Sequence, residues 1–204
     1  MKQNKKFYNF IAWFLRPFVK LFFPYEILGS ENIKGLKNGY MICSNHLSNI
    51  DPVFYIVSHP RHIHFMAKAE LFSNKFLGKI FSSLGAFAVK RGKGDYQAIN
   101  EAQNILKNGE ILGIFIEGTR SKTGEFLRPK SGAALLASSS GVPVIPVCIT
   151  GSSKDNRVHV FKKTVIKYGA PITSEQLGIG GGTRVEIKNA TNLIMKKIKE
   201  LRGE

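Results

Sequence analysis

The sequence has few acidic residues, few cysteines and no long uninterrupted apolar run. Only two cysteines occur among 204 residues, Cys43 and Cys148, and both lie in apolar stretches. This excludes a disulfide-stapled secreted domain and is typical of a reducing compartment. The 20 glycines and eight prolines are spread along the chain, which excludes collagen-like and low-complexity architectures. No fixed-period repeat is present either.

What the chain does have is enough apolar material for one globular core, since 43% of its residues are hydrophobic.

The chain also carries a large excess of positive charge: 30 Lys and Arg against 14 Asp and Glu give a formal net charge of +16. Such an excess indicates an anionic partner: nucleic acid, an acidic membrane surface or a phosphorylated substrate. Zinc-finger spacing, an RNP-type aromatic signature and a basic zipper are all absent, so we expect no nucleic-acid partner.

The N-terminal segment combines many aromatic residues with a narrow polar stripe. Its longest charge-free stretch, Phe7–Leu15, is shorter than the roughly 20 residues that a spanning helix needs. No small-x-small cleavage site follows it, as a signal peptide would require. We expect residues 1–24 to form an amphipathic helix on a membrane surface, with its aromatic rings at headgroup depth and its lysines toward anionic lipid. The alternative is a helix that covers the core of its own domain.

Beyond this segment, strand-like and helical stretches alternate. This alternation predicts a single α/β domain over residues 25–204, with a mixed, largely parallel central sheet flanked by helices. Strands are expected at 25–29, 40–44, 63–67, 86–89, 111–116, 142–150 and 164–168. Helices are expected after an Asp51 N-cap, over 96–107 after an Asp95 cap, over 130–140, and after a capping box at 183–186.

A histidine follows the expected strand 40–44, and an aspartate follows the histidine at a helix start. His46 and Asp51 can fold back into a contact in which the carboxylate fixes the imidazole tautomer and leaves the other ring nitrogen as a base. The competing use is a serine nucleophile, Ser44 or Ser48, but the Gly-x-Ser-x-Gly elbow is missing. The pattern therefore favours a base acting on water or on a substrate hydroxyl.

Two further strand ends carry residues suited to a phosphate group. The strand 111–116 runs into Glu117-Gly118-Thr119-Arg120, and the strand 86–89 runs into Lys90-Arg91-Gly92. Because the carboxyl ends of parallel strands share one edge of a sheet, we expect these cations near the His–Asp pair. Arg120 can bind a phosphate through two parallel hydrogen bonds.

The blocks at 45–52, 115–121 and 142–147 together resemble those of the glycerolipid acyltransferase family. The order and spacing of the blocks agree, and a further pattern of Lys68, Leu71, Gly78 and Arg91 also fits. The resemblance covers roughly residues 25–170, and within the family it is strongest to bacterial enzymes that acylate lysophosphatidate. One departure is Ile116, which stands where the family usually has proline; isoleucine continues the strand.

The resemblance implies transfer of a fatty acyl group from an acyl thioester, acyl-CoA or acyl-ACP, to the free sn-2 hydroxyl of lysophosphatidate, giving phosphatidate in phospholipid synthesis. His46 would be the general base and Asp51 would orient it. The residues expected to bind the acceptor and its phosphate are Lys68, Arg91, Glu117, Gly118, Thr119 and Arg120. No resident cofactor is implied. The expected location is the cytoplasmic face of the cell membrane, as a peripheral or monotopic protein.

Two alternatives remain open. The acceptor could be glycerol 3-phosphate or a lyso-amino-lipid instead. The chain could also be a non-catalytic binder of anionic lipid or nucleic acid.

His59, His62 and His64 cluster in the sequence. A zinc site would need a further ligand nearby, and both cysteines are in distant strands, so we expect no metal.

Overall fold

The computed structural model describes residues 5–90, 95–151, 153–154, 157–158 and 160–204. Arg91, one of the expected phosphate ligands, lies outside these residues. The helices are α1 (Lys5–Phe22), α2 (Asp51–Ser58), α3 (Lys75–Ser83), α4 (Tyr96–Lys107), α5 (Gly132–Ser140), α6 (Ser174–Leu177) and α7 (Arg184–Arg202). The strands are β1 (Tyr25–Leu28), β2 (Tyr40–Ser44), β3 (Ile63–Lys68), β4 (Ala86–Val89), β5 (Ile111–Phe115), β6 (Val144–Thr150), β7 (Ser153–Lys154), β8 (Arg157–Val158) and β9 (Thr164–Tyr168).

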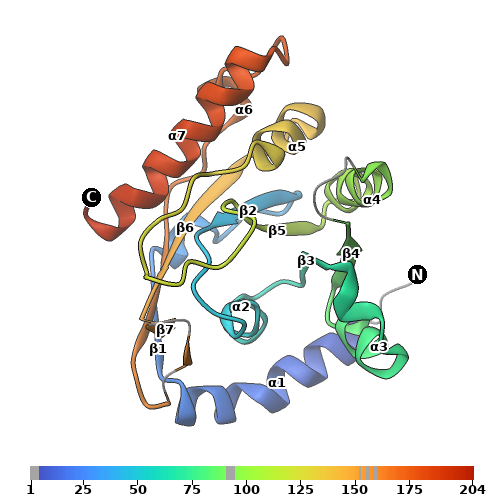
Figure 1. Cartoon of the computed structure of the whole chain (residues 1–204), viewed down its shortest axis with the longest axis vertical. Coiled ribbons are helices and arrows are strands. Elements are labelled where there is room, and N and C mark those ends of the chain that lie inside the picture. Colours follow the sequence, from blue (N-terminus) through green and yellow to red (C-terminus); the bar gives the residue numbers. More distant parts are fainter. Residues whose placement is uncertain (1–4, 91–94, 152, 155–156, 159) are drawn as a thin grey trace.

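Seven of these strands form one sheet in the order β1-β9-β6-β2-β5-β3-β4 (Figure 1). All neighbouring pairs are parallel except β6 and β9, which are antiparallel. The mixed, largely parallel sheet that the sequence predicts is therefore confirmed. Because β6, β2, β5, β3 and β4 run in the same direction, their carboxyl ends lie along one edge, where α/β sheets carry their functional loops.

Helices cover both faces of the sheet (Figure 1). On one face, α4, α5 and α7 pack against alternate strand residues such as Met41 and Leu112. On the other, α1 and α2 pack against the intervening residues, such as Ile42 and Ile111. This two-sided burial explains why β2 has no exposed residue and reads as a continuous apolar run rather than as an alternating one.

Helix α1 packs on the domain through one side and exposes a wide apolar side. Its Tyr8 and Ala12 share a small core cluster with Ile56 of α2, against which Leu84 also packs. Large side chains of the opposite side are exposed: Phe7, Phe10, Trp13, Phe14, Phe18, Leu21 and Phe22. Among the described residues, we find no helix whose length and apolar character would let it cross a bilayer.

Two cations of the polar stripe of α1 contact the domain. Lys5 Nζ lies 2.6 Å from a carboxylate oxygen of Glu110, and Arg16 Nε donates a 2.8 Å hydrogen bond to the carbonyl oxygen of Val57. Val57 is in the last turn of α2, whose carbonyl groups lack partners within the helix, so a cation there is favourable. Lys5 and Arg16 therefore contact the domain while remaining exposed, and Lys20 is exposed as well.

Most expected elements are present, but α6, β7 and β8 were not expected, and three helices differ in the following ways. Helix α2 begins at Asp51 with Ile50 as its N-cap, so Asp51 does not cap it; its carboxylate is turned back toward the preceding loop instead. Helix α5 begins at Gly132 rather than at residue 130. Helix α3 was not expected, although Asn74 caps it by accepting hydrogen bonds from the amides of Phe76 and Leu77.

Candidate active site

The loop after β2 is organised around one carboxylate oxygen. Oδ2 of Asp51 lies 2.8 Å from Nδ1 of His46 and accepts hydrogen bonds from the backbone amides of Leu47 at 2.7 Å and Ser48 at 2.8 Å. Since a carboxylate oxygen already serving two amides is an acceptor, we assign the proton to Nδ1 of His46. The neutral ring then has its acceptor lone pair on Nε2, which is the arrangement a general base needs.

The imidazole is held from its face as well as from its edge. Its ring stacks on Phe115 with centroids 3.8 Å apart and an angle of 14° between the planes. Phe115 in turn stacks on Phe65 of β3 at 5.8 Å. Phe65 has room because Gly113 faces it: a Cβ on Gly113 would come within 2.3 Å of the Phe65 ring. His46 is thus positioned by a stack of rings, and 12% of its side-chain surface is exposed.

Asn45 fixes the same loop to the neighbouring strand. Its side-chain amide nitrogen donates to the carbonyl oxygen of Ile149, and its side-chain oxygen accepts from the amide of Ile149. These paired bonds mimic one more step of the β2–β6 ladder, near the last residue of β6. The His46 loop therefore begins from a buried, rigid anchor.

The two candidate serine nucleophiles are engaged elsewhere. The hydroxyl of Ser44 donates to the carbonyl oxygen of Asn45 and accepts a 2.7 Å hydrogen bond from the hydroxyl of Tyr55. The hydroxyl of Ser48 accepts from the amide of Ile50. Among the described residues, no hydrogen bond joins either hydroxyl to His46, in agreement with the missing elbow motif.

The loop after β5 is tied directly to the His46 loop. The amide of Ser121 donates a 2.8 Å hydrogen bond to the carbonyl oxygen of His46. The turn that follows β5 uses Gly118 at φ +69°, whose amide donates to the carbonyl oxygen of Phe115. The positive φ explains why glycine occupies this position. Farther along, the amide of Lys130 donates to the carbonyl oxygen of Ile116 and closes the loop.

Glu117 is the buried ionisable group of this second loop, with 1% of its surface exposed. Burial raises the pKa of its carboxyl to about 7, against the lowering effect of the backbone amides of Leu127 and His46. Near neutral pH the group is therefore divided between its neutral and charged forms. Sequence reasoning identified Glu117 as a pocket residue but gave no indication of its burial.

The expected phosphate-binding residues occupy the same edge of the sheet with different exposure. Lys68 ends β3, is exposed and pairs with Glu70 at 3.0 Å. Thr119 is exposed and Arg120 half-buried in the loop after β5. Because Ser44 pairs with Phe115 in the parallel ladder, His46 and Glu117 stand at equivalent positions beyond adjacent strands. The structure thus brings the described residues of the predicted set to one edge.

Sequence reasoning missed the residues that support the second loop from the C-terminus. Arg202 of α7 donates to the carbonyl oxygen of Gly124, and its guanidinium carbon lies 3.8 Å from the centroid of the Phe126 ring. An aromatic residue in an otherwise polar loop was the available signal, but its partner could not be identified without the fold.

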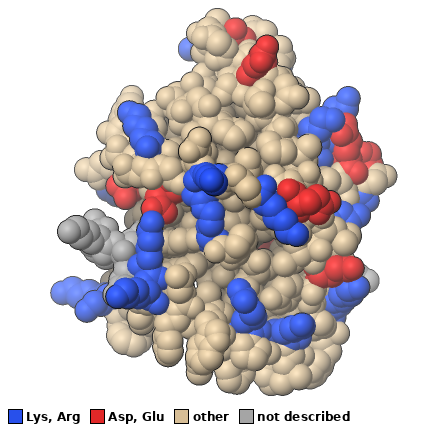
Figure 2. Space-filling view, turned by 180° about the vertical axis from the view of Figure 1, so that it is seen from behind, with Lys and Arg blue, Asp and Glu red and all other residues tan. Residues whose placement is uncertain are grey.

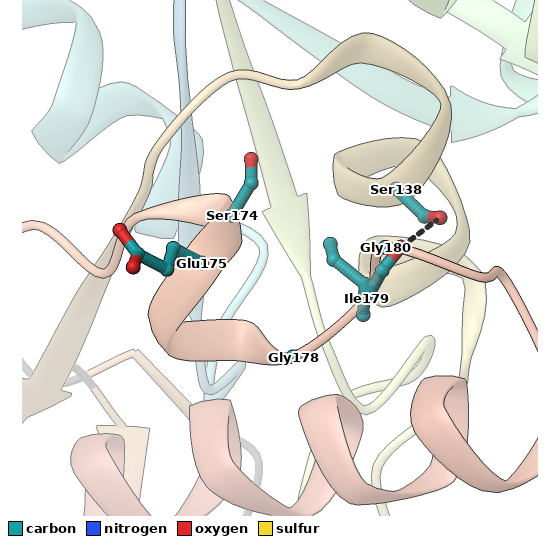
Figure 3. A pocket seen from close by; sticks show the side chains of 6 residues that line it. All are labelled: Ser138, Ser174, Glu175, Gly178, Ile179 and Gly180. Carbon is teal, nitrogen blue, oxygen red and sulfur yellow. Dashed lines mark hydrogen bonds between the residues drawn. The ribbon is translucent and has the colours of Figure 1, made fainter.

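A separate shallow pocket of about 290 Å³ lies between α5, α6 and the segment before α7 (Figure 3). Ser138 donates there to the carbonyl oxygen of Ile179. Ile172, just before α6, pairs with Val144 at the start of β6, whereas Asn45 pairs with Ile149 near its end. The pocket therefore lies at the opposite end of β6 from His46 and does not belong to the candidate active site.

The charge of the surface can be followed in Figure 2. On this face Lys and Arg side chains outnumber the acidic ones and stand in several separate groups, with Asp and Glu between them. The view does not show one continuous basic stripe of the kind that tracks a nucleic-acid backbone.

Comparisons with known proteins agree with the geometry. The family model described as Acyltransferase matches residues 25–150. A protein of Bacillus subtilis (strain 168) named 1-acyl-sn-glycerol-3-phosphate acyltransferase is 29% identical over 198 residues, which cover 97% of this chain and 98% of that protein. The chloroplastic 1-acyl-sn-glycerol-3-phosphate acyltransferase LPAT1 of Arabidopsis thaliana is 31% identical over 158 residues. That match covers 74% of this chain and 43% of the plant protein, so the chain spans less than half of the plant relative.

A solved structure has the same fold. The crystal structure of the 1-acyl-sn-glycerophosphate (LPA) acyltransferase PlsC from Thermotoga maritima superimposes with a TM-score of 0.74 at 26% sequence identity, covering 100% of this chain and 85% of that one. The resemblance found in the sequence blocks is therefore confirmed over most of the chain. Since the family model spans more than half of the residues, including His46, Asp51 and the Glu117–Arg120 loop, the chain belongs to the acyltransferase family.

Proposed function

We propose that the protein is a 1-acyl-sn-glycerol-3-phosphate acyltransferase. It transfers a fatty acyl group from acyl-CoA or acyl-ACP to the free sn-2 hydroxyl of lysophosphatidate and forms phosphatidate for phospholipid synthesis. His46 is the general base and Asp51 its orienting partner. The single observation that carries this proposal is the His46–Asp51 contact of 2.8 Å, with two amides on the same carboxylate oxygen.

The reaction needs one proton acceptor and no covalent intermediate on the enzyme. Nε2 of His46 takes the proton from the acceptor hydroxyl while the hydroxyl oxygen attacks the thioester carbonyl carbon. When the tetrahedral intermediate collapses, the carbon–sulfur bond breaks and the thiolate takes the proton from the imidazolium. Asp51 stabilises that imidazolium while it exists. The engagement of Ser44 and Ser48 in other hydrogen bonds supports direct transfer over a serine-bound acyl group.

The acceptor is held by its phosphate. Lys68 and Arg120 contribute cations from adjacent strand ends, together with Arg91, which lies outside the described residues. Glu117, Gly118 and Thr119 shape the loop that carries Arg120. The bond between Ser121 and His46 fixes this loop relative to the base, and such positioning accounts for a large share of rate enhancement in reactions of two bound substrates.

We place the enzyme on the surface of a membrane as a monotopic protein, at its cytoplasmic face. The support is the exposed aromatic side of α1, where Trp13 is 69% and Phe10 56% exposed. Aromatic side chains suit the boundary between headgroups and acyl chains, and both substrates of the proposed reaction carry acyl chains. The acyl thioester is a co-substrate, and the proposed reaction requires no resident cofactor.

The test is product analysis with the purified full chain. Palmitoyl-CoA or the palmitoyl-ACP thioester is offered with lysophosphatidate, glycerol 3-phosphate or a lyso-amino-lipid, and the lipids are identified by mass spectrometry. We expect phosphatidate to form from lysophosphatidate. This activity should be retained in the Ser48→Ala variant and lost in the His46→Ala variant. Transfer only to another acceptor would contradict the assigned substrate, and salt-dependent DNA binding without any transfer would contradict an enzymatic role.

A further inference from the structure

A second group of chemistry-bearing side chains lies at the other end of the sheet. His62 comes just before β3, His64 is its second residue, and Glu110 comes just before β5. One ligand atom of each lies within 4.8 Å of the others. The sequence offered two histidines on one strand face but no third ligand; the fold supplies Glu110.

Strand register explains why these three side chains meet. Ile63 pairs with Ile111 in the parallel ladder, so His62 stands beside Glu110. Side chains alternate between the two faces of a sheet, which puts His62, His64 and Glu110 on the same face. The imidazole rings of His62 and His64 have centroids 4.4 Å apart, and Nε2 of His64 lies 3.7 Å from Oε2 of Glu110.

The two imidazoles are buried, and Glu110 is the only acidic group paired with either of them among the described residues. His62 is 8% and His64 6% exposed, and none of their four ring nitrogens has a hydrogen-bond partner among the described residues. A buried polar group left in this state is normally satisfied by something else, because its desolvation is otherwise uncompensated. Burial also lowers the pKa of His62 to about 4 and lowers that of His64.

Neighbouring residues pack closely around the cluster. Gly85 passes close to His62 at φ +86°, and a Cβ there would lie 2.5 Å from the ring nitrogen Nε2. Tyr8 of α1 covers the other side, its ring centroid 4.0 Å from that of His62. Lys5 contacts Oε1 of Glu110, while Oε2 is the oxygen on the His64 side. The carboxylate can therefore keep its ion pair and still present one oxygen to a metal.

We propose that His62, His64 and Glu110 form a structural site for a divalent transition-metal ion, with zinc as the best match. Two neutral imidazoles and one carboxylate are a ligand set known from zinc enzymes, in which water takes the fourth position of the tetrahedron. The ion would join β3 to β5 and, through Tyr8 on His62, fix the start of α1 to the domain. This role is independent of acyl transfer, because the site lies at the amino ends of strands whose carboxyl ends carry Lys68 and Glu117.

The test uses the full chain stripped of metal with a chelator and then titrated with Zn²⁺, and with Mg²⁺ as a hard-cation control. We expect one equivalent of zinc to bind, and the melting temperature to rise by about 5–10 °C when free zinc is about a hundred times its Kd. Magnesium is expected to give neither effect. Absence of stoichiometric zinc binding would overturn the proposal.

Substitutions distinguish this site from other zinc-binding histidines. Glu110→Gln keeps the size of a half-buried side chain and is expected to weaken zinc binding at least about tenfold, with His64→Phe as a second variant. Glu175→Gln, at an exposed carboxylate of α6 that is not part of the cluster, is the matched control and should bind as the unaltered chain does. Co²⁺ absorption gives an independent readout of a tetrahedral site. Unchanged zinc affinity in Glu110→Gln would overturn the assignment.

Discussion

The amide of Ser121 donates a hydrogen bond of 2.8 Å to the carbonyl oxygen of His46. The two residues come from loops that follow neighbouring strands, β2 and β5, and are far apart in the sequence. This bond joins the loop of His46, the proposed base, to the loop of Arg120, a proposed phosphate ligand. The backbones of the two loops are therefore held together at this point.

Replacing Asp51 by Asn tests the orientation of the imidazole. An asparagine oxygen can still accept from the amides of Leu47 and Ser48, but the side chain no longer carries the charge that stabilises the imidazolium. We expect kcat to fall by about 10²–10⁴-fold, the usual worth of a positioned base. Steady-state kinetics and circular dichroism of the folded variant check this; a variant with unaltered kcat would contradict the role of Asp51.

Replacing Arg120 by Ala tests the binding of the acceptor. Loss of a charge-assisted hydrogen bond, worth about 1.5–3 kcal/mol, is expected to lower kcat/KM for lysophosphatidate by about 10–100-fold, chiefly through KM. Lys107→Ala, at the exposed end of α4, removes one positive charge away from this edge and serves as the control. Equal effects of the two substitutions would show that only the overall charge matters.

The buried carboxyl of Glu117 predicts a pH-dependent stability. Its pKa in the folded chain is raised to about 7 from the ordinary value of 4.5 for glutamate, so the folded state holds the proton more tightly than the unfolded state. The stabilising contribution is complete below about pH 4.5 and is lost as the pH rises through about 7. The loss is of the order of 1–3 kcal/mol, since each pKa unit corresponds to about 1.4 kcal/mol.

Glu117→Gln removes this titration. Denaturant unfolding between pH 5 and 9 is expected to show a decline in the free energy of unfolding for the unaltered chain and a smaller decline for the variant. Parallel pH profiles for both proteins would mean that Glu117 does not titrate in this range.

The exposed side of α1 predicts membrane binding that can be removed without unfolding. Simultaneous replacement of Phe10, Trp13 and Phe14 by Ser takes away three exposed rings. Because each such side chain contributes about 1.5–3 kcal/mol when buried, we expect partition into anionic vesicles to fall by at least about 100-fold with little change in melting temperature. Deleting the helix is a poorer test, since Tyr8, Ala12 and Val19 belong to the core.

A control for this experiment is available on α7, where Val185 is 67% exposed. Val185→Ser removes an exposed apolar side chain outside α1 and is expected to leave vesicle sedimentation unchanged. If the triple variant sediments as fully as the unaltered chain, membrane association through α1 is refuted.

Local signals were sufficient for much of the fold. Asp95 does accept from the amide of Ala98 at the start of α4, and Thr183 forms its capping box with Glu186 at the start of α7. Such caps act over three or four residues, so the sequence contains them completely. The His46–Asp51 contact was predictable for the same reason, since only five positions separate the two residues.

Features that depend on strand order could not be read from the sequence. The stack of Phe65, Phe115 and His46 requires β3 to lie beside β5, and nothing local specifies that neighbour. The same holds for Glu110 beside His62. The role of Asp51 could not be predicted for a different reason. An aspartate before proline is typical of an N-cap, but the carboxylate of Asp51 accepts hydrogen bonds from the amides of Leu47 and Ser48 instead.

The most direct test of the account is acyl transfer by His46→Ala. The side chain is partly exposed, and its loss leaves Asp51 with its two amide donors, so the variant is expected to fold. Single-turnover measurement with lysophosphatidate and palmitoyl-CoA, or the ACP thioester, should show the chemical step slowed by at least about 10²-fold with acceptor binding retained. A folded His46→Ala protein that transfers acyl groups at the full rate would contradict the account.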